Sequence, residues 1–154
     1  MGKRVITLGT WNGNPIEWIV LREDNTGTLV MAKLSFSWQF NSNNNNRWEY
    51  SQIRNFLNND FFNQAFSIEE RKKIVNILLT DVGTKDNVFI LNKVDAESLW
   101  NDNSIRKSDF DGNRCWLRTP RESSTLWGID TDGCVDRNLP ARDNYSFYPA
   151  MFIR

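Results

Sequence analysis

CWLRTPRESSTLWGIDTDGCVDRNLPARDNYSFYPAMFI, residues 115–153, is the stretch that decides the fold. Short apolar runs at residues 115–118, 126–130 and 148–153 alternate with polar segments, which is typical of antiparallel strands joined by turns. The Asp132-Gly133 pair favours a tight hairpin turn, because both residue types tolerate positive φ. We therefore predict short antiparallel strands in the C-terminal third, with the returning hairpin strand at residues 134–136.

The N-terminal segment shows the same strand pattern. Apolar runs at residues 5–8, 16–21 and 28–33 are separated by polar turns at residues 12–15 and 24–27. Three antiparallel strands are expected to open the domain.

The middle of the chain is predicted to be helical. Apolar residues recur at helical spacing from Ile53 to Phe61, and Ser51 is positioned to cap that helix. Residues 67–75 begin with Ser-x-x-Glu, the pattern of a capping box, and predict a second helix.

Shorter elements are expected on either side of these helices. The Asn-rich residues 41–46 predict a surface loop, since Asn side chains bond their own backbone. Residues 88–91 read as a strand, residues 95–100 as one or two helical turns, and residues 101–113 as polar connection.

Composition bounds the class of protein. The chain has 154 residues, no internal repeat and no linker, so one domain spanning residues 1–154 is expected. Its 19 basic and 19 acidic residues give no net charge and make nucleic acid a poor candidate partner. We find no membrane span and no apolar signal segment, and therefore expect a cytoplasmic protein.

The sequence lacks the residues that several kinds of catalysis require. The sequence contains no histidine, which removes histidine-based triads, general bases and metal ligands. It also lacks the glycine-rich nucleotide motifs and the hydrolase nucleophile motif. We predict no catalytic residues, no cofactor and no metal site.

Two weaker alternatives involve cysteine and calcium. Cys115 and Cys134 are most simply thiols, with a single bridge as the alternative if the protein is exported. The acidic residues at 109–113 and 130–136 could hold calcium, but their spacing departs from that of an EF-hand loop. Asp and Gly are also the ordinary residues of tight turns.

Trp127 is the candidate ligand-contacting tryptophan. Trp18 and Trp116 lie in apolar strands and are expected in the core, whereas Trp127 lies in a polar segment. The C-terminal arginines, including Arg118, Arg121, Arg137 and Arg142, are interleaved with carboxylates, so we expect local salt bridges there.

The sequence resembles a bacterial family of domains of unknown function that occurs widely in Gram-positive gut bacteria. The most specific matches are WLRTP at residues 116–120, DGCV at residues 132–135 and PAMFI at residues 149–153. Residues 16–21 and 53–58 match an earlier strand and helix of that family. Tyr148 stands where the family has an arginine that would anchor the last strand.

The closing pattern is similar to C-type-lectin-like folds, including retroelement-diversified receptors and formylglycine-generating enzymes. This resemblance implies an α+β fold of short antiparallel strands with two to three short helices. It also implies that ligand-facing residues lie between positions 123 and 145. The candidates in this region are Trp127, Asp130, Asp136, Arg137, Asn138, Arg142, Asn144 and Tyr145.

The leading hypothesis is a non-enzymatic module that binds a protein or glycan ligand through these C-terminal loops. One alternative is an enzyme of the same fold that uses carboxylates or the two cysteines. Another is a structural module within a larger assembly.

Overall fold

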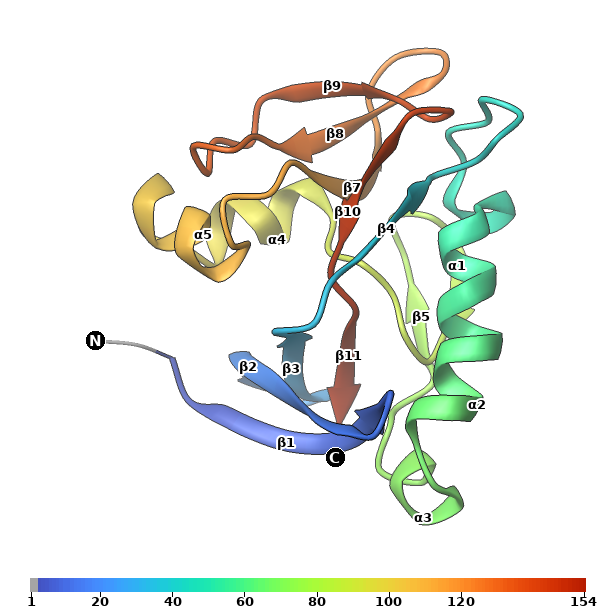
Figure 1. The fold of residues 1–154 in the computed structure, drawn as a ribbon, viewed down its shortest axis with the longest axis vertical. Coiled ribbons are helices and arrows are strands. Elements are labelled where there is room, and N and C mark those ends of the chain that lie inside the picture. Colours follow the sequence, from blue (N-terminus) through green and yellow to red (C-terminus); the bar gives the residue numbers. More distant parts are fainter. Residues whose placement is uncertain (1–2) are drawn as a thin grey trace.

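The computed structural model describes residues 3–154 and has a mixed α+β architecture with mostly antiparallel strands. A four-stranded sheet has the order β1-β2-β3-β11, and a five-stranded sheet has the order β4-β10-β7-β8-β9 (Figure 1). The first sheet consists of β1 (Val5–Trp11), β2 (Asn14–Asp24), β3 (Gly27–Ala32) and β11 (Ala150–Ile153). The second consists of β4 (Phe36–Gln39), β7 (Cys115–Pro120), β8 (Thr125–Ile129), β9 (Arg137–Pro140) and β10 (Asn144–Phe147).

The three predicted N-terminal strands are confirmed as β1, β2 and β3. The first turn contains only Asn12 and Gly13, whose φ angles are 51° and 80°. Positive φ at both central residues is the geometry that lets a two-residue hairpin follow the strand twist. Trp11 therefore pairs with Asn14 across the turn.

The predicted C-terminal hairpin exists, but its second strand begins later than residues 134–136. β8 pairs with β9, and Gly128 lies opposite Arg137, which leaves a loop between them. Side chains shape this loop: Asp130 accepts from the Thr131 amide at 2.8 Å and Asp132 from the Cys134 amide at 3.0 Å. The Gly133 amide also donates to the Asp130 carbonyl, and the Asp130 amide to the Cys134 carbonyl, both at 2.9 Å. A turn therefore forms at the predicted Asp132-Gly133 pair, although β9 begins only at Arg137.

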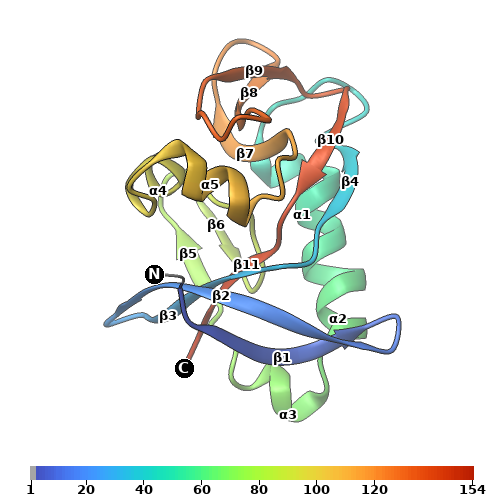
Figure 2. The same ribbon diagram turned by 60° about the vertical axis from the view of Figure 1, so that its left-hand side comes forward.

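The predicted strand at residues 148–153 is shorter, and a separate strand, β10, precedes it. β10 belongs to the second sheet and β11 to the first, so the chain crosses between the sheets at Tyr148 and Pro149 (Figures 1 and 2). Pro149 has no amide hydrogen to donate to a continuous ladder.

Tyr148 anchors this crossing in place of the arginine that the resemblance implied. Its hydroxyl lies 2.9 Å from the Phe110 carbonyl oxygen and 2.7 Å from Asp111 Oδ2. Burial, followed by the Asp111 hydrogen bond, raises the pKa of Tyr148. The terminal strand is thus held by a neutral hydroxyl.

The helix predicted from Ile53 to Phe61 is confirmed, together with its cap, and it continues to Ala65. It comprises α1 (Gln52–Phe56), a π-helical turn (Leu57–Phe61) and α2 (Phe62–Ala65). Ser51 Oγ accepts from the Arg54 amide at 3.0 Å, and the buried face carries Ile53, Leu57 and Phe61. A short 3₁₀ turn, Trp48–Tyr50, precedes it.

The second predicted helix begins with the expected capping box but ends early. α3 spans Ile68–Arg71, with Ser67 and Glu70 bonded reciprocally. The expected continuation to residue 75 is wrong because Val75 donates to the Phe152 carbonyl at 2.9 Å and Ile74 bridges to Ile153. Tertiary pairing with the last strand thus overrides the local helical pattern.

The strand predicted at residues 88–91 is also wrong. Phe89 makes only an isolated bridge, to Ala150. Asn58 and Arg118 supply side-chain partners to the backbone of Val88 and Ile90. These side chains satisfy groups that a neighbouring strand would otherwise occupy.

The described chain has more helices than the two to three expected. α4 (Lys93–Ser98) overlaps the helical turns predicted at residues 95–100, but it begins two residues earlier and ends at Ser98. α5 (Asn103–Asp109) arises in the segment predicted as polar connection. Asp102 caps α5 through the Ile105 amide at 2.8 Å. A small two-stranded sheet, β5 (Ile77–Leu79) and β6 (Thr84–Asp86), completes the fold.

Candidate ligand-binding face

The eight sequence-predicted site residues separate into two groups on the second sheet. Five lie on or beside the β8–β9 hairpin: Trp127, Asp130, Asp136, Arg137 and Asn138. Three lie on or just before β10: Arg142, Asn144 and Tyr145. Because β7 and β8 lie between β9 and β10 in the sheet order, the structure does not gather the eight residues into one site.

Trp127 is half-buried and already contacts two cations. Arg121 Cζ lies 3.8 Å from its ring centroid and Lys93 Nζ lies 4.5 Å from it. Asn138, its cross-strand partner, donates to Glu122 Oε1 at 2.8 Å. Cation–π contacts use the same ring face that a stacked ligand would need.

Asp130 is the centre of a local ion-pair cluster. It accepts from Arg114 Nε at 3.1 Å and Nη2 at 3.0 Å, while Arg137 Nη1 lies 3.7 Å away. The Thr131 amide, followed by these two arginines, lowers the pKa of Asp130. The expected salt bridging is confirmed for Arg137, and Asp136 remains exposed.

The remaining predicted arginines behave differently from one another. Arg118 is buried and forms a bidentate pair with Asp81, at 3.1 and 2.8 Å. Arg121 donates to the carbonyls of Asp136 and Arg137. Arg142 is exposed and takes part in no ion pair within residues 3–154. Only some of the expected salt bridges therefore form.

The β4–β10 ribbon has one aromatic and one polar face. Tyr145 pairs with Trp38 and Phe147 with Phe36, which places these four rings on one side of the two strands. On the other side, Ser37 Oγ lies 2.8 Å from Asn144 Oδ1. Alternation along two neighbouring strands thus produces the two faces.

An apolar hollow opens beside the aromatic face. Phe36, Ser37, Trp38, Phe56 and Phe147 line a volume of about 270 Å³, which we call the aromatic hollow. Phe56 comes from α1, and its ring centroid lies 5.1 Å from that of Phe36 and 6.2 Å from that of Trp38. Trp38 is 41% exposed, so a large aromatic side chain remains open to a ligand at this hollow.

The C-terminal residues lie next to this hollow. The Tyr145 ring packs edge-on against buried Trp116, with centroids 5.1 Å apart. Trp116 Nε1 donates to the Trp38 carbonyl at 2.9 Å, so the buried indole supports both strands of the ribbon. Gln39 Nε2 donates to the Arg142 carbonyl at 2.7 Å and holds the approach to β10 in place.

Sequence reasoning missed the aromatic hollow, although a signal was present. Residues 34–40 read LSFSWQF, which alternates strictly between apolar and polar residues, as a half-buried strand does. The contribution of Phe56 had no such signal, because its helix meets β4 only in the folded protein.

The Asn-rich loop lies beside the C-terminal loops at the end of the second sheet. Asn46 Nδ2 donates to the carbonyls of Glu122 and Thr125, at 2.6 and 3.0 Å. Asn41, Asn43 and Asn45 each accept from the amide two residues ahead. The predicted surface loop is confirmed, and its side chains largely satisfy its own backbone.

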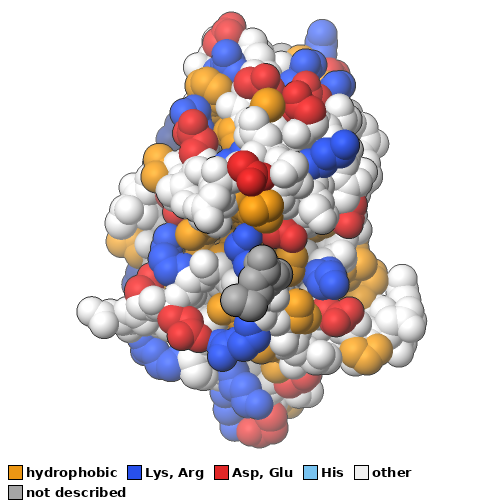
Figure 3. Space-filling model, turned by 90° about the vertical axis from the view of Figure 1, so that its left-hand side faces the viewer, with side chains coloured by type: hydrophobic (Ala, Val, Ile, Leu, Met, Phe, Trp, Pro, Cys, Tyr) orange, Lys and Arg blue, Asp and Glu red, His pale blue; other side chains and the backbone are white. Residues whose placement is uncertain are grey.

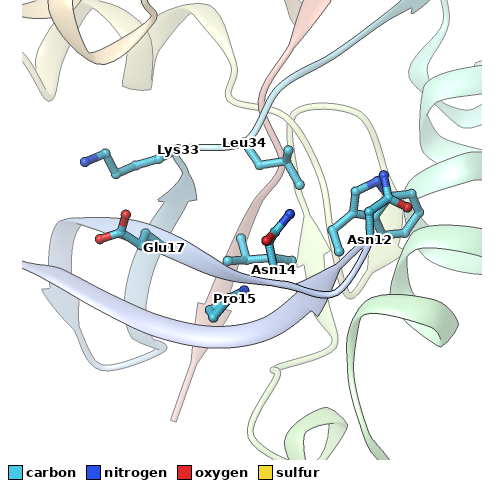
Figure 4. Close-up of a pocket in the computed structure, with 8 residues that line it drawn as sticks. Asn12, Asn14, Pro15, Glu17, Lys33 and Leu34 are labelled. Carbon is cyan, nitrogen blue, oxygen red and sulfur yellow. The ribbon is translucent and has the colours of Figure 1, made fainter.

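Two other hollows are more polar in their lining. One, of about 290 Å³, lies at the β1–β2 hairpin and includes Asn12, Asn14, Pro15, Glu17, Lys33 and Leu34 (Figure 4). The Lys33 ammonium points away from Leu34 in this view. A second, of about 480 Å³, includes Arg54 and Asn58, but Arg54 is bonded to Asp86 and Asn58 to Val88. Its principal polar groups therefore already have partners.

Within the described residues 3–154, both cysteines are free thiols. Burial raises the pKa of the Cys115 thiol, which contacts the Asn113 carbonyl at 3.3 Å. Desolvation and then Asp132 raise the pKa of Cys134. Since the thiolate is the nucleophile, neither environment favours cysteine chemistry.

The acidic residues do not converge. Within residues 3–154 no three Asp, Glu or Cys side chains gather as a metal site would require. Asp109 accepts from Trp100 Nε1 at 2.7 Å, Asp111 bonds Tyr148, and Asp130 pairs with Arg114. On the face in Figure 3, charges of both signs are interspersed, without a large field of one sign.

Comparison with known proteins gives one family. Residues 18–154 match the family described as "Domain of unknown function (DUF6273)". The chain belongs to this family. The region matched to DUF6273 contains the whole second sheet and the aromatic hollow. No curated protein and no solved structure matches the chain. None of the helices in the described part of this DUF6273 domain is long and apolar enough to cross a bilayer.

Proposed function

We propose that this DUF6273 domain is a non-enzymatic ligand-binding module with a C-type-lectin-like fold, which contacts a protein or glycan through its C-terminal region. The observation that carries this proposal is Trp38, 41% exposed at an otherwise apolar hollow. Asn144 and Tyr145 lie on the neighbouring strand, so the ligand surface joins β4 to part of the predicted C-terminal set.

Binding at the hollow is favourable because a ligand covers apolar surface that is exposed to water. Covering a large apolar side chain releases water and is worth roughly 1.5–3 kcal/mol. An indole also offers a flat face on which a sugar ring or an apolar side chain can pack. Trp127 has less to gain from a ligand, since Arg121 and Lys93 already contact its ring.

Polar groups around the hollow supply orientation. On the ribbon, Asn144 carries an exposed hydrogen-bonding side chain, and Arg142 adds an exposed charge at the Gln39 end. A binding site that combines an apolar surface with a few polar groups is typical of ligand sites on proteins.

The topology supports the lectin-like part of the proposal. The C-terminal third contributes β7, β8, β9 and β10, and the chain then returns as β11 beside β3 (Figure 1). The loops and strands between residues 123 and 145 thus belong to a single sheet, on which a ligand-facing surface can be built.

Binding to glycan and protein arrays tests the proposal. Wild type is compared with Trp38→Ala and with Trp127→Ala, a matched substitution of the half-buried indole on the same sheet. We expect ligands to bind wild type and Trp127→Ala, and to lose at least tenfold in affinity to Trp38→Ala. Loss with Trp127→Ala alone would place the ligand on the β8–β9 hairpin, and the hollow would then have no role. Thermal melting of each variant verifies that the fold is kept.

A further inference from the structure

β4 is an edge strand with backbone groups directed away from its sheet. It pairs with β10 on one side only. Ser146 donates its amide to the carbonyl of Arg114, the residue just before β7, so Tyr145 and Phe147 direct their backbone groups towards β4. Their partners, Trp38 and Phe36, make the ladder with β10, and the backbone groups of Ser37 and Gln39 consequently point outwards.

Both edges of the four-stranded sheet are protected. β1 is interrupted by a bulge between Thr7 and Thr10, where Gly9 has a φ of 76° and donates to Glu70 Oε2 at 3.0 Å. β11 is covered by Phe89 and by Val75, which donates to the Phe152 carbonyl. Bulges and covering segments are the usual means by which proteins block pairing at sheet edges.

β9, the opposite edge of the second sheet, is protected as well. It ends in Pro140, which cannot donate to a ladder. Arg121 occupies the carbonyls of Asp136 and Arg137, at 2.9 and 3.1 Å. β4 reads Phe-Ser-Trp-Gln and has no proline, glycine, charge or register shift, so it lacks these protections.

The aromatic hollow lies where an added strand would place a side chain. A strand paired with β4 would run about 4.8 Å away, with alternate side chains on the aromatic face. Ser37 and Trp38 are both exposed, and Figure 2 shows β4 at the outer margin of the molecule. The hollow of about 270 Å³ can receive a large apolar side chain from the added strand.

A positive charge at one end of the ribbon favours an acidic residue in such a peptide. Arg142 lies at the Gln39 end of the ribbon, is exposed and has no ion pair within residues 3–154. An acidic residue on the ligand would complement it. The outward amides and carbonyls of Ser37 and Gln39 require an extended peptide backbone, which a glycan does not have.

We propose that β4 captures an extended peptide of a partner protein by strand addition, with an apolar side chain in the aromatic hollow and an acidic residue beside Arg142. This inference rests on the proposed function, because it specifies the ligand of the same hollow. The bound peptide extends the sheet order to peptide-β4-β10-β7-β8-β9.

Selection from a displayed library of linear octapeptides tests the proposal. Selected peptides are expected to carry a large apolar residue and a nearby Asp or Glu. Ser37→Pro removes an outward amide without breaking the β4–β10 ladder, and should weaken these peptides about tenfold or more. Ser37→Ala, the matched control, retains the amide and should bind within about threefold of wild type. Arg142→Ala should reduce the preference for the acidic residue.

A second measurement does not depend on how well Ser37→Pro folds. Methylating backbone nitrogens of a selected peptide one at a time should abolish binding at alternate positions only, because every second amide faces β4. In hydrogen exchange, the amides of Ser37 and Gln39 should exchange rapidly in the isolated protein and become protected when the peptide is added.

The outcomes separate this inference from the proposed function. If Trp38→Ala abolishes binding and Ser37→Pro does not, the hollow binds ligand but strand addition is wrong. If glycans bind at the hollow and no peptide is selected, strand addition is again wrong. If neither substitution affects binding, both proposals fail. A dimer that dissociates in Ser37→Pro, without peptide binding, would assign the edge to a second copy of the chain and overturn the peptide.

Discussion

The β8–β9 hairpin and the β4–β10 ribbon belong to the same sheet, and each carries one tryptophan. Trp127 pairs with Asn138 in the hairpin, and Trp38 pairs with Tyr145 in the ribbon. Trp127 contacts Arg121 and Lys93, whereas Trp38 stands 41% exposed beside an apolar hollow. The residue type is the same, and the surroundings differ. A tryptophan is available to a ligand where the protein leaves much of its ring exposed, and this condition depends on neighbours that are distant in the sequence.

The largest effect is expected when the indole that supports the ribbon is removed. Trp116 is buried on β7, packs against Tyr145 and donates to the Trp38 carbonyl. Trp116→Ala should lower the free energy of unfolding by about 3–5 kcal/mol, because it leaves a large cavity. Urea denaturation measures this change. A loss below about 1 kcal/mol would contradict the role of Trp116 in supporting β4 and β10.

Gly128→Ala should disturb the hairpin and spare the ribbon. A Cβ at Gly128 would overlap Leu139 Cδ1 and lie 2.8 Å from the Cys115 carbonyl oxygen. Relieving this overlap should cost about 1–3 kcal/mol of stability, as overpacking typically does. Calorimetric melting measures the cost, and ligand binding at the hollow should persist at temperatures where the variant is folded. Unchanged melting would contradict the close packing of β8 against β9.

Arg121→Ala should make the hairpin resemble the ribbon. The substitution removes the cation 3.8 Å from the Trp127 ring and should cost about 0.5–1 kcal/mol. In protein labelled with fluorotryptophan, a soluble paramagnetic agent should broaden the ¹⁹F resonance of Trp127 more in the variant than in wild type. The Trp38 resonance serves as the internal control and should not change. Equal responses of the two resonances would contradict the difference in their surroundings.

The smallest effect concerns pH at the hairpin. The Thr131 amide and the two arginines hold the pKa of Asp130 below its ordinary value of 3.8. The stability that Asp130 contributes is therefore present above that value and is lost as pH falls through the lower folded-state pKa. The stability difference between wild type and Asp130→Asn should shrink as pH falls below about 4. Asp136→Asn, at an exposed position on the same hairpin, is the control for removing one carboxylate. A difference that grows on acidification would contradict the lowered pKa.

Local sequence signals predicted the elements whose partners are nearby. The β1–β2 turn, the Ser51 cap and the Ser67–Glu70 capping box all form as expected, because each depends on residues within a few positions. Predictions failed where a distant segment competes for the backbone. Residues 72–75 leave the helical pattern to bond β11. In residues 88–91, Val88 and Ile90 take side-chain partners, and Phe89 makes only an isolated bridge to Ala150.

The candidate site shows the same limit. Arg142, Asn144 and Tyr145 were predicted as candidate ligand contacts and lie on or just before β10, the strand that pairs with β4, and their role in binding stays a prediction. Trp38 and Phe56, which line the hollow, were not among the predicted site residues. Their relation depends on β4 meeting both β10 and α1, and the first of these contacts joins residues as far apart as Ser37 and Asn144.

By itself, the sequence determined the strand-rich α+β class, the caps and turns, and the lack of histidine chemistry, because these follow from residue type and short-range spacing. Only the tertiary structure decided which tryptophan is covered and which is open, and which sheet edge remains unprotected. Side-chain exposure and edge pairing depend on which surfaces meet after folding, and the period of a strand specifies its two faces without specifying what will cover them.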